Sequence, residues 1–189
     1  MPALPPPLPG HECGECTACC VEMAIDDPAL QKPEGAVCCH MLAARGCAIY
    51  AARPQTCRVW QCGWRFMNLS QAMRPDRSGI LLMPEMASDE KGGLRVVAIG
   101  DDREAVLGNA ELLDLIAKCV KGGAPIFLSH GSGAYAKRVM VNDMLSAAVA
   151  DGDKARFVEI LRATLLELAE RVRLEMSVAQ FTAAKTPGP

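Results

Sequence analysis

Nine of the ten cysteines of this 189-residue chain lie within its first 62 residues, and four of them form a single run. That run reads Cys13-Gly-Glu-Cys16-Thr-Ala-Cys19-Cys20. Thiolates are soft, negatively charged ligands, so crowding of this kind indicates metal binding, disulfide formation or oxidation chemistry. The tenth cysteine, Cys119, stands alone in an expected helix and is excluded from the site.

The spacing of the run favours metal. Cysteines three residues apart converge from a turn or from one helical face, and a CxxC pair is the commonest local clamp for zinc. The adjacent Cys19 and Cys20 diverge by roughly 100° on a helix, so a single tetrahedral ion accommodates both only awkwardly. The doublet therefore leaves three readings open: two metal sites, a multi-iron cluster, or one ligand beside a spare thiol.

Further thiols follow downstream, at Cys38, Cys39, Cys47, Cys57 and Cys62. Structural zinc sites and four-cysteine iron–sulfur clusters each take four ligands, so nine candidates suffice for two such sites. The run does not match the bacterial ferredoxin pattern, because its fourth cysteine directly follows the third and precedes valine.

The composition of the chain limits the classes of partner and the cellular compartment that we expect. A net charge of −2 and 4% aromatic residues give no electrostatic or stacking case for nucleic acid or an anionic membrane. The N-terminal segment has no basic stretch and its prolines interrupt the apolar residues, unlike a secretory signal. We therefore expect a cytoplasmic protein, in which clustered cysteines bind metal in preference to forming disulfides. A metal ion is the expected partner, nucleic acid and membrane are not expected, and the sequence does not identify a protein partner.

A second motif follows the first run and Cys39-His40-Met41-Leu42. It reads Gly46-Cys47-Ala48-Ile49-Tyr50-Ala51-Ala52-Arg53-Pro54-Gln55-Thr56-Cys57-Arg58-Val59-Trp60-Gln61-Cys62. In this order the motifs resemble the CxxCxxCC cysteine-cluster family, a bacterial family described as zinc- or iron-chelating. The resemblance covers about residues 11–65. It implies metal ligands at Cys13, Cys16, Cys19, Cys20, Cys39, Cys47, Cys57 and Cys62.

Two questions follow from the resemblance. Cys38 is extra to the family pattern, so either Cys38 or Cys39 is the ligand. The cysteine pattern is also similar to that of flagellin lysine N-methylases, which implies an iron–sulfur redox or group-transfer enzyme as an alternative function. The chain has no convincing glycine-rich loop for S-adenosylmethionine, so the methylase activity is not carried over.

Some neighbours of the cysteines have roles to offer. Arg53 and Arg58 are expected to offset thiolate charge and donate hydrogen bonds to sulfur. Tyr50 and Trp60 can cover a metal centre. His11 and His40 could replace a cysteine ligand, although a solvated or indirect role is more common for such histidines.

The predicted fold is α+β: a loop-rich cysteine module, a small antiparallel sheet and C-terminal helices. We expect a disordered proline-rich leader at 1–10, the metal module at 11–75, an α+β part packed on it at 76–182 and a flexible tail at 183–189. Strand-like runs at 80–83 and 94–99 predict one hairpin, and runs at 125–128 and 135–141 predict another. The Ser129-His130-Gly131-Ser132-Gly133 segment between the second pair is interpreted as a glycine-rich turn, because it lacks the order of a nucleophile elbow.

Apolar periodicity predicts three helices. They span 102–121, then 142 to about 150 with Asn142 as its cap, and about 154–176. Phe157, Ile160, Leu161, Leu165, Leu168 and Val172 are expected on one face of the last helix.

The predicted function is a metal-binding protein that holds zinc or iron, or an iron–sulfur cluster, through clustered thiolates. A third reading is an interaction module whose metal only stabilises a surface for another protein. The sequence identifies no catalytic residue and no substrate.

Overall fold

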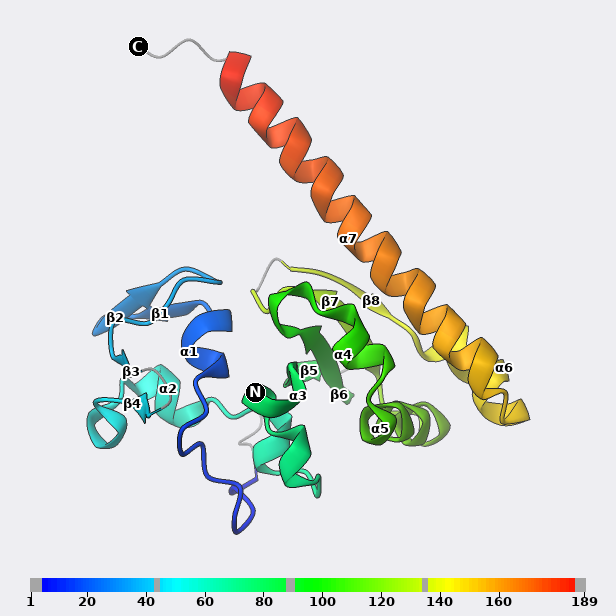
Figure 1. Cartoon of the computed structure of the whole chain (residues 1–189), viewed down its shortest axis with the longest axis horizontal. Coiled ribbons are helices and arrows are strands. Elements are labelled where there is room, and N and C mark those ends of the chain that lie inside the picture. The colour runs from blue at the N-terminus through cyan, green and yellow to red at the C-terminus, as the bar shows by residue number, and fades with distance from the viewer. Residues whose placement is uncertain (1–4, 43–44, 88–90, 134–135, 186–189) are drawn as a thin grey trace.

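The computed structural model describes residues 5–42, 45–87, 91–133 and 136–185, with side chains described as far as Arg173. Short helices and two-stranded ribbons occupy the cysteine-rich first third, and a four-stranded sheet with helices occupies the rest (Figure 1). The predicted α+β class is therefore confirmed. Within the described residues, no helix combines the length and apolarity needed to cross a bilayer.

The cysteine module is built from very short elements. Its helices are α1 (Ala18–Glu22) and α2 (Gln55–Val59). Two antiparallel ribbons lie between them, and they consist of β1 (Ile25–Asp27) with β2 (Leu30–Lys32), and β3 (Met41–Leu42) with β4 (Gly46–Cys47). Short 3₁₀ turns follow at Tyr50–Ala52, Gly63–Arg65 and Gln71–Met73. Elements of this length bury little apolar surface, so the module needs other sources of stability.

The larger sheet has the strand order β5-β6-β7-β8. Its strands are β5 (Ile80–Met86), β6 (Gly92–Ala98), β7 (Ile126–His130) and β8 (Lys137–Met140). Both predicted hairpins are confirmed, because β5 pairs antiparallel with β6 and β7 pairs antiparallel with β8. The central β6–β7 pair is parallel, so this sheet is mixed. The helical connection between these two strands returns the chain to the same end of the sheet, as parallel pairing requires.

That connection differs from the expected single helix over 102–121. It consists of α4 (Arg103–Leu107) and α5 (Ala110–Lys121), separated at Gly108. The Asp102 side chain caps α4 by accepting a hydrogen bond from the Ala105 backbone, and Asn109 caps α5 in the same way at Leu112. Two good N-caps seven residues apart favour two helices over one. A short α3 (Pro75–Ser78) precedes the sheet.

The last two helices are α6 (Asn142–Asp151) and α7 (Lys154–Lys185). The predicted cap at Asn142 is wrong, because its side chain forms other hydrogen bonds. Its oxygen accepts from the Ile126 amide at the start of β7, and its nitrogen donates to the Ala124 carbonyl. Gly152 ends α6 in the left-handed conformation, where glycine is favoured.

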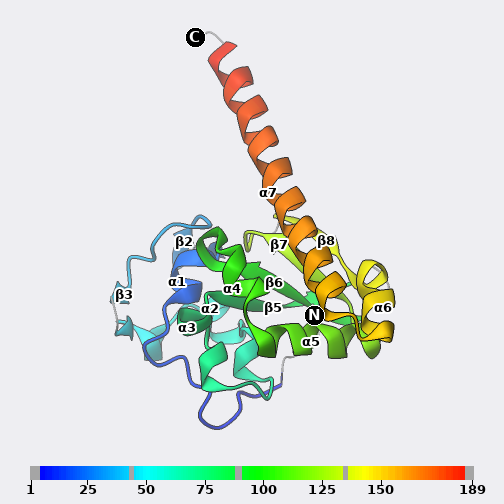
Figure 2. The same cartoon turned by 45° about the vertical axis from the view of Figure 1, so that its right-hand side comes forward.

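The predicted face of α7 is largely confirmed, with four residues buried: Phe157, Leu161, Leu165 and Leu168. The helix packs on β7 and β8 and then continues nine residues beyond the predicted end, away from the sheet (Figure 2). Of the expected tail, residues 183–185 are helical and 186–189 lie outside the described residues.

The cysteine module is joined to the sheet through buried side chains and backbone bonds. Trp64 and Met73 are almost fully buried in the same apolar core as the strands. A side chain at Gly63 would collide with Leu82 of β5, so the close approach of the two parts requires glycine there. The described part of the expected leader, residues 5–10, is also attached, because the Leu8 amide donates to the Arg65 carbonyl at 2.8 Å.

Candidate metal centre

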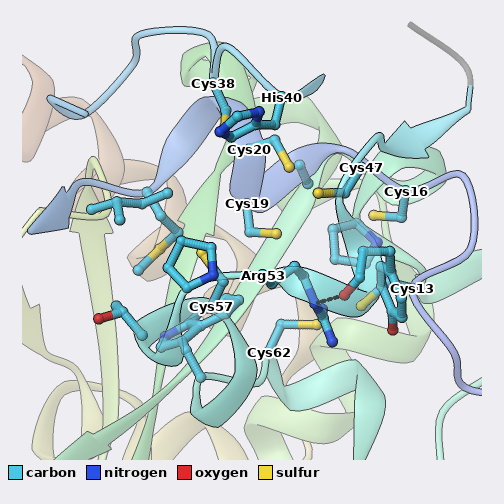
Figure 3. A pocket seen from close by; sticks show the side chains of 18 of the residues that line it. Cys13, Cys16, Cys19, Cys20, Cys38, His40, Cys47, Arg53, Cys57 and Cys62 are labelled. Atoms are coloured by element: carbon cyan, nitrogen blue, oxygen red, sulfur yellow. Dashed lines mark hydrogen bonds between the residues drawn. The ribbon is translucent and has the colours of Figure 1, made fainter. Parts of the chain in front are cut away.

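Eight of the nine N-terminal cysteines line one cavity in the module, with a volume of about 110 Å³ (Figure 3). They come from a turn, two helices, a strand and two loops, and they are Cys13, Cys16, Cys19, Cys20, Cys38, Cys47, Cys57 and Cys62. All ten cysteines of the chain are free thiols. Segments that are distant in the sequence thus bring their thiols to one place.

The first four thiols come from a turn that leads into α1. The Cys16 amide donates to the Cys13 carbonyl at 2.9 Å, which closes the turn, and Gly14 inside it has a φ of +53°. Cys19 and Cys20 are the second and third residues of α1. A side chain at Gly46 would collide with the Gly14 carbonyl, so glycine lets β4 lie directly against this turn.

The adjacent Cys38 and Cys39 have different environments. The Cys38 amide donates to the Cys20 carbonyl at 2.9 Å, and the Cys38 residue is buried against the cavity. Cys39 is exposed and does not line the cavity. Cys47 reaches the cavity from β4, whose partner strand begins just after Cys38 and His40. The cavity thiol at this point of the chain is therefore that of Cys38.

Cys57 is placed by α2, and α2 is held by a buried aspartate. The Asp27 carboxylate on β1 accepts hydrogen bonds from the Thr56 amide at 3.2 Å and the Thr56 hydroxyl at 3.0 Å. It also accepts one from the Ala29 amide at 3.0 Å. These three bonds lower the pKa of Asp27, because they favour its charged form. Pro54 precedes the helix as its N-cap residue and also lines the cavity.

Three cations stand close to the thiols. Arg53 lines the cavity, with its guanidinium 3.7 Å from the centre of the Tyr50 ring and its Nε donating to the Tyr50 carbonyl at 2.9 Å. Lys32 is buried and its ammonium donates to the carbonyls of Val21, Pro33 and Ala36. Arg65 also lines the cavity. Clustered thiolates repel one another, and these cations oppose that repulsion.

The other residues singled out from the sequence differ in whether they line the cavity. Tyr50, Trp60 and His40 line the cavity. Arg58 is exposed and does not line the cavity. His11 stacks on Trp64 with ring centroids 4.4 Å apart, and its Nδ1 lies 2.5 Å from the Trp64 carbonyl oxygen. These contacts engage His11 in packing at the base of the module.

Sequence reasoning missed Lys32, Arg65 and Asp76. The Asp76 carboxylate lies close enough to the Cys16 thiol to help raise its pKa, and it forms an ion pair with Arg74, whose Nε lies 2.6 Å from the carboxylate. Lys32 and Asp76 lie in segments without cysteines, so no spacing rule connects them to the site. Arg65 lies three residues after Cys62, and that proximity was the only available signal.

The pKa values of the cysteine thiols differ, because their environments differ. A hydrogen bond from Cys19, together with the charges of Lys32 and Arg53, lowers the pKa of Cys20 to about 7. The same hydrogen bond and burial raise the pKa of Cys19 well above the ordinary thiol value. Burial raises the pKa of Cys62 to about 12, and it also raises the pKa values of Cys16, Cys38 and Cys57. The two thiols of the doublet therefore differ in acidity, with Cys20 the more acidic.

The donor set fits a soft metal by its chemistry. Eight thiols, a histidine and nearby cations surround one cavity, which is the composition that zinc and iron–sulfur sites use. Among the described residues, no group of three Cys, His, Asp or Glu side chains converges closely enough to hold an ion as it stands. The thiols gather round the cavity without meeting at one point.

Comparisons with known proteins leave the site to be interpreted from its own residues. No family model, no curated protein and no solved structure matches the chain.

Proposed function

We propose that this chain is a metal-binding protein that holds zinc or iron through the thiolates of the cavity. One observation carries the proposal: eight cysteines spread from Cys13 to Cys62 reach a single cavity. A module with such short elements has little apolar core to bring these segments together. Metal–thiolate bonds supply folding free energy in small modules of this kind.

The ligands in this proposal are the eight cavity cysteines, with Cys38 in the place that the family pattern gives to Cys39. Bound zinc would supply structural cross-links between the turn, α1, β4 and α2, and a bound iron–sulfur cluster would add electron transfer. The protein's own contribution is to hold the thiols near one another and to lower the repulsion between them with Lys32, Arg53 and Arg65. Tyr50 and Trp60 line the cavity and would limit the access of water to a bound metal.

The likeness to the CxxCxxCC cysteine-cluster family supports the same proposal. Its two motifs occur here in the family order, and the cysteines of both contribute to the cavity lining. The enzyme alternative differs from a structural metal site in the identity of the metal, so the same experiment distinguishes them.

The test is elemental analysis and absorption spectroscopy of the full chain purified without oxygen. The proposal predicts stoichiometric zinc in a colourless protein, or iron with visible absorbance. Iron with acid-labile sulfide, bleached by dithionite, would identify the iron–sulfur alternative. Substitution of Cys57 by serine should lower the metal content, whereas the controls Cys39→Ser and Cys119→Ser should keep it. A wild-type chain that contains neither metal, even after reconstitution with Zn²⁺ or Fe²⁺ under reducing conditions, would refute the proposal.

A further inference from the structure

The eight cavity thiols do not all have the same neighbours. Cys62 lies close enough to Cys13 and Cys16 for their charges to act on it, and Cys19 has the same two neighbours. Cys13, Cys16, Cys19 and Cys62 thus form one group of four, which we name the first quartet.

The other four thiols form a second group. Cys38 is bonded through its amide to the Cys20 carbonyl, and it lies within reach of the charges of Cys20 and Cys47. Cys57 has Cys20, Cys38 and Cys47 as its thiol neighbours. Cys20, Cys38, Cys47 and Cys57 make up the second quartet. In Figure 3, Cys20 and Cys38 lie toward one end of the cavity and Cys13 and Cys62 toward the other.

The doublet is the point where the two quartets meet. Cys19 and Cys20 are consecutive residues of α1, so their side chains leave the helix roughly 100° apart. Such a divergence suits two neighbouring sites better than one. Each quartet also has its own cation, since Arg65 acts on Cys62 and Lys32 and Arg53 act on Cys20. Four thiolates and one divalent ion together have a net charge of −2, and an adjacent cation offsets part of this negative charge.

We propose that the cavity contains two four-thiolate metal sites, and that the CC doublet gives one ligand to each. The first site uses Cys13, Cys16, Cys19 and Cys62. The second uses Cys20, Cys38, Cys47 and Cys57. Four cysteines are the complement of a structural zinc ion or of one iron–sulfur cluster. This inference rests on the proposed function and assigns the number of sites and the ligands of each.

The test compares double variants within one quartet and across the two. The full chain is reconstituted with Zn²⁺ under reducing conditions, and its zinc content is measured by native mass spectrometry. Wild type and the control Cys39→Ser should hold two ions. The within-quartet variants Cys16→Ser/Cys62→Ser and Cys38→Ser/Cys57→Ser should each hold one ion. The across-quartet variant Cys57→Ser/Cys62→Ser should lose tight binding at both sites.

A second measurement on the wild-type chain keeps the proposal testable if a variant fails to fold. At one equivalent of Zn²⁺, alkylation followed by peptide mapping should show the cysteines of a quartet protected together. Protection of Cys62 together with Cys57 at one equivalent of zinc would overturn the two-site assignment and leave metal binding intact. So would a wild-type chain that is saturated by one ion. A chain that binds no metal would overturn both.

Discussion

At the scale of single residues, two neighbours in the sequence differ in function. Cys38 and Cys39 are chemically the same, but only Cys38 is buried against the cavity. The family pattern pointed to Cys39, and no rule of spacing separates the two, because the loop between β2 and β3 has no periodicity that orients side chains. The hydrogen bond from Cys38 to the Cys20 carbonyl is what turns the loop.

Serine substitution at each position tests this difference. We expect Cys38→Ser to weaken zinc binding by at least about 10–100-fold, the loss that even an indirect partner of a metal causes when it is removed. Cys39→Ser should leave the affinity unchanged. Competition with a chromophoric chelator measures both variants under identical conditions, and the reverse order of effects would exclude Cys38 as a ligand.

Acidity gives a second prediction at this scale. With a pKa raised to about 12, Cys62 is protonated at neutral pH in the metal-free chain, as is Cys19, whose pKa is also raised. Metal must displace these protons, so zinc affinity should rise with pH, by about tenfold per unit for each proton released. Chelator competition between pH 6.5 and pH 8.5 measures the slope. An affinity that is flat or falls over this range would show that these thiols are not ligands.

At the scale of elements, the buried Asp27 links the β1–β2 ribbon to α2. Its carboxylate bonds both donors of Thr56, the residue before Cys57, so the position of that thiol depends on a residue 30 positions away in the sequence. The lowered pKa of Asp27 keeps the carboxylate charged. The link therefore holds at and above the ordinary pKa of aspartate and is lost as pH falls through the lowered value.

Replacing Asp27 with alanine should weaken zinc binding by about 10–100-fold, because α2 loses the contact that positions Cys57. The matched control is Asp26→Ala, which removes an exposed carboxylate from the same strand. Zinc titration of both variants at pH 7.5 provides the comparison. Equal affinities in the two variants would mean that α2 is positioned by other contacts.

Element prediction from the sequence succeeded where local pattern decides the structure. The strand runs of β5 and β6 and the buried face of α7 follow from apolar periodicity alone. The break between α4 and α5 was missed because the apolar pattern continues across Gly108 and Asn109, while capping decides the boundary. The parallel β6–β7 pair was missed because pairing of distant strands depends on the path of the chain between them.

At the scale of the whole molecule, the turn after β7 attaches the cysteine module to the sheet. The Glu34 carboxylate accepts a hydrogen bond from the Ser132 amide, and the Ser132 hydroxyl donates to the Glu22 carbonyl at 2.5 Å. Arg95, paired with Glu85, donates to the Gly133 carbonyl at 3.1 Å from within the sheet. The segment that resembled a nucleophile motif is therefore a joint between the two parts.

Side chains at Gly131 or Gly133 would collide with Glu34. We expect Gly133→Ala to displace the Glu34 carboxylate and to lower the free energy of unfolding by about 1 kcal/mol, the typical contribution of a hydrogen bond. Gly92→Ala is the control, because a methyl group there meets no other atom within 4 Å. Chemical denaturation measures both variants, and equal stabilities would argue against the joint.

Removal of metal should affect the two parts unequally. In hydrogen exchange with a chelator, we expect α1, the β3–β4 ribbon and α2 to lose protection, while β5–β8 keep theirs, because the sheet has its own apolar core. Unchanged exchange in the cysteine module would mean that metal does not stabilise it.

The central claim is that cysteine sulfur binds the metal in this module. X-ray absorption at the metal edge of the full chain, purified without oxygen, tests it most directly. For zinc, we predict four sulfur neighbours at about 2.3 Å and no nitrogen or oxygen in the first shell. A first shell with nitrogen or oxygen at about 2.0–2.1 Å would contradict two four-thiolate sites, and a shell without sulfur would contradict the claim as a whole.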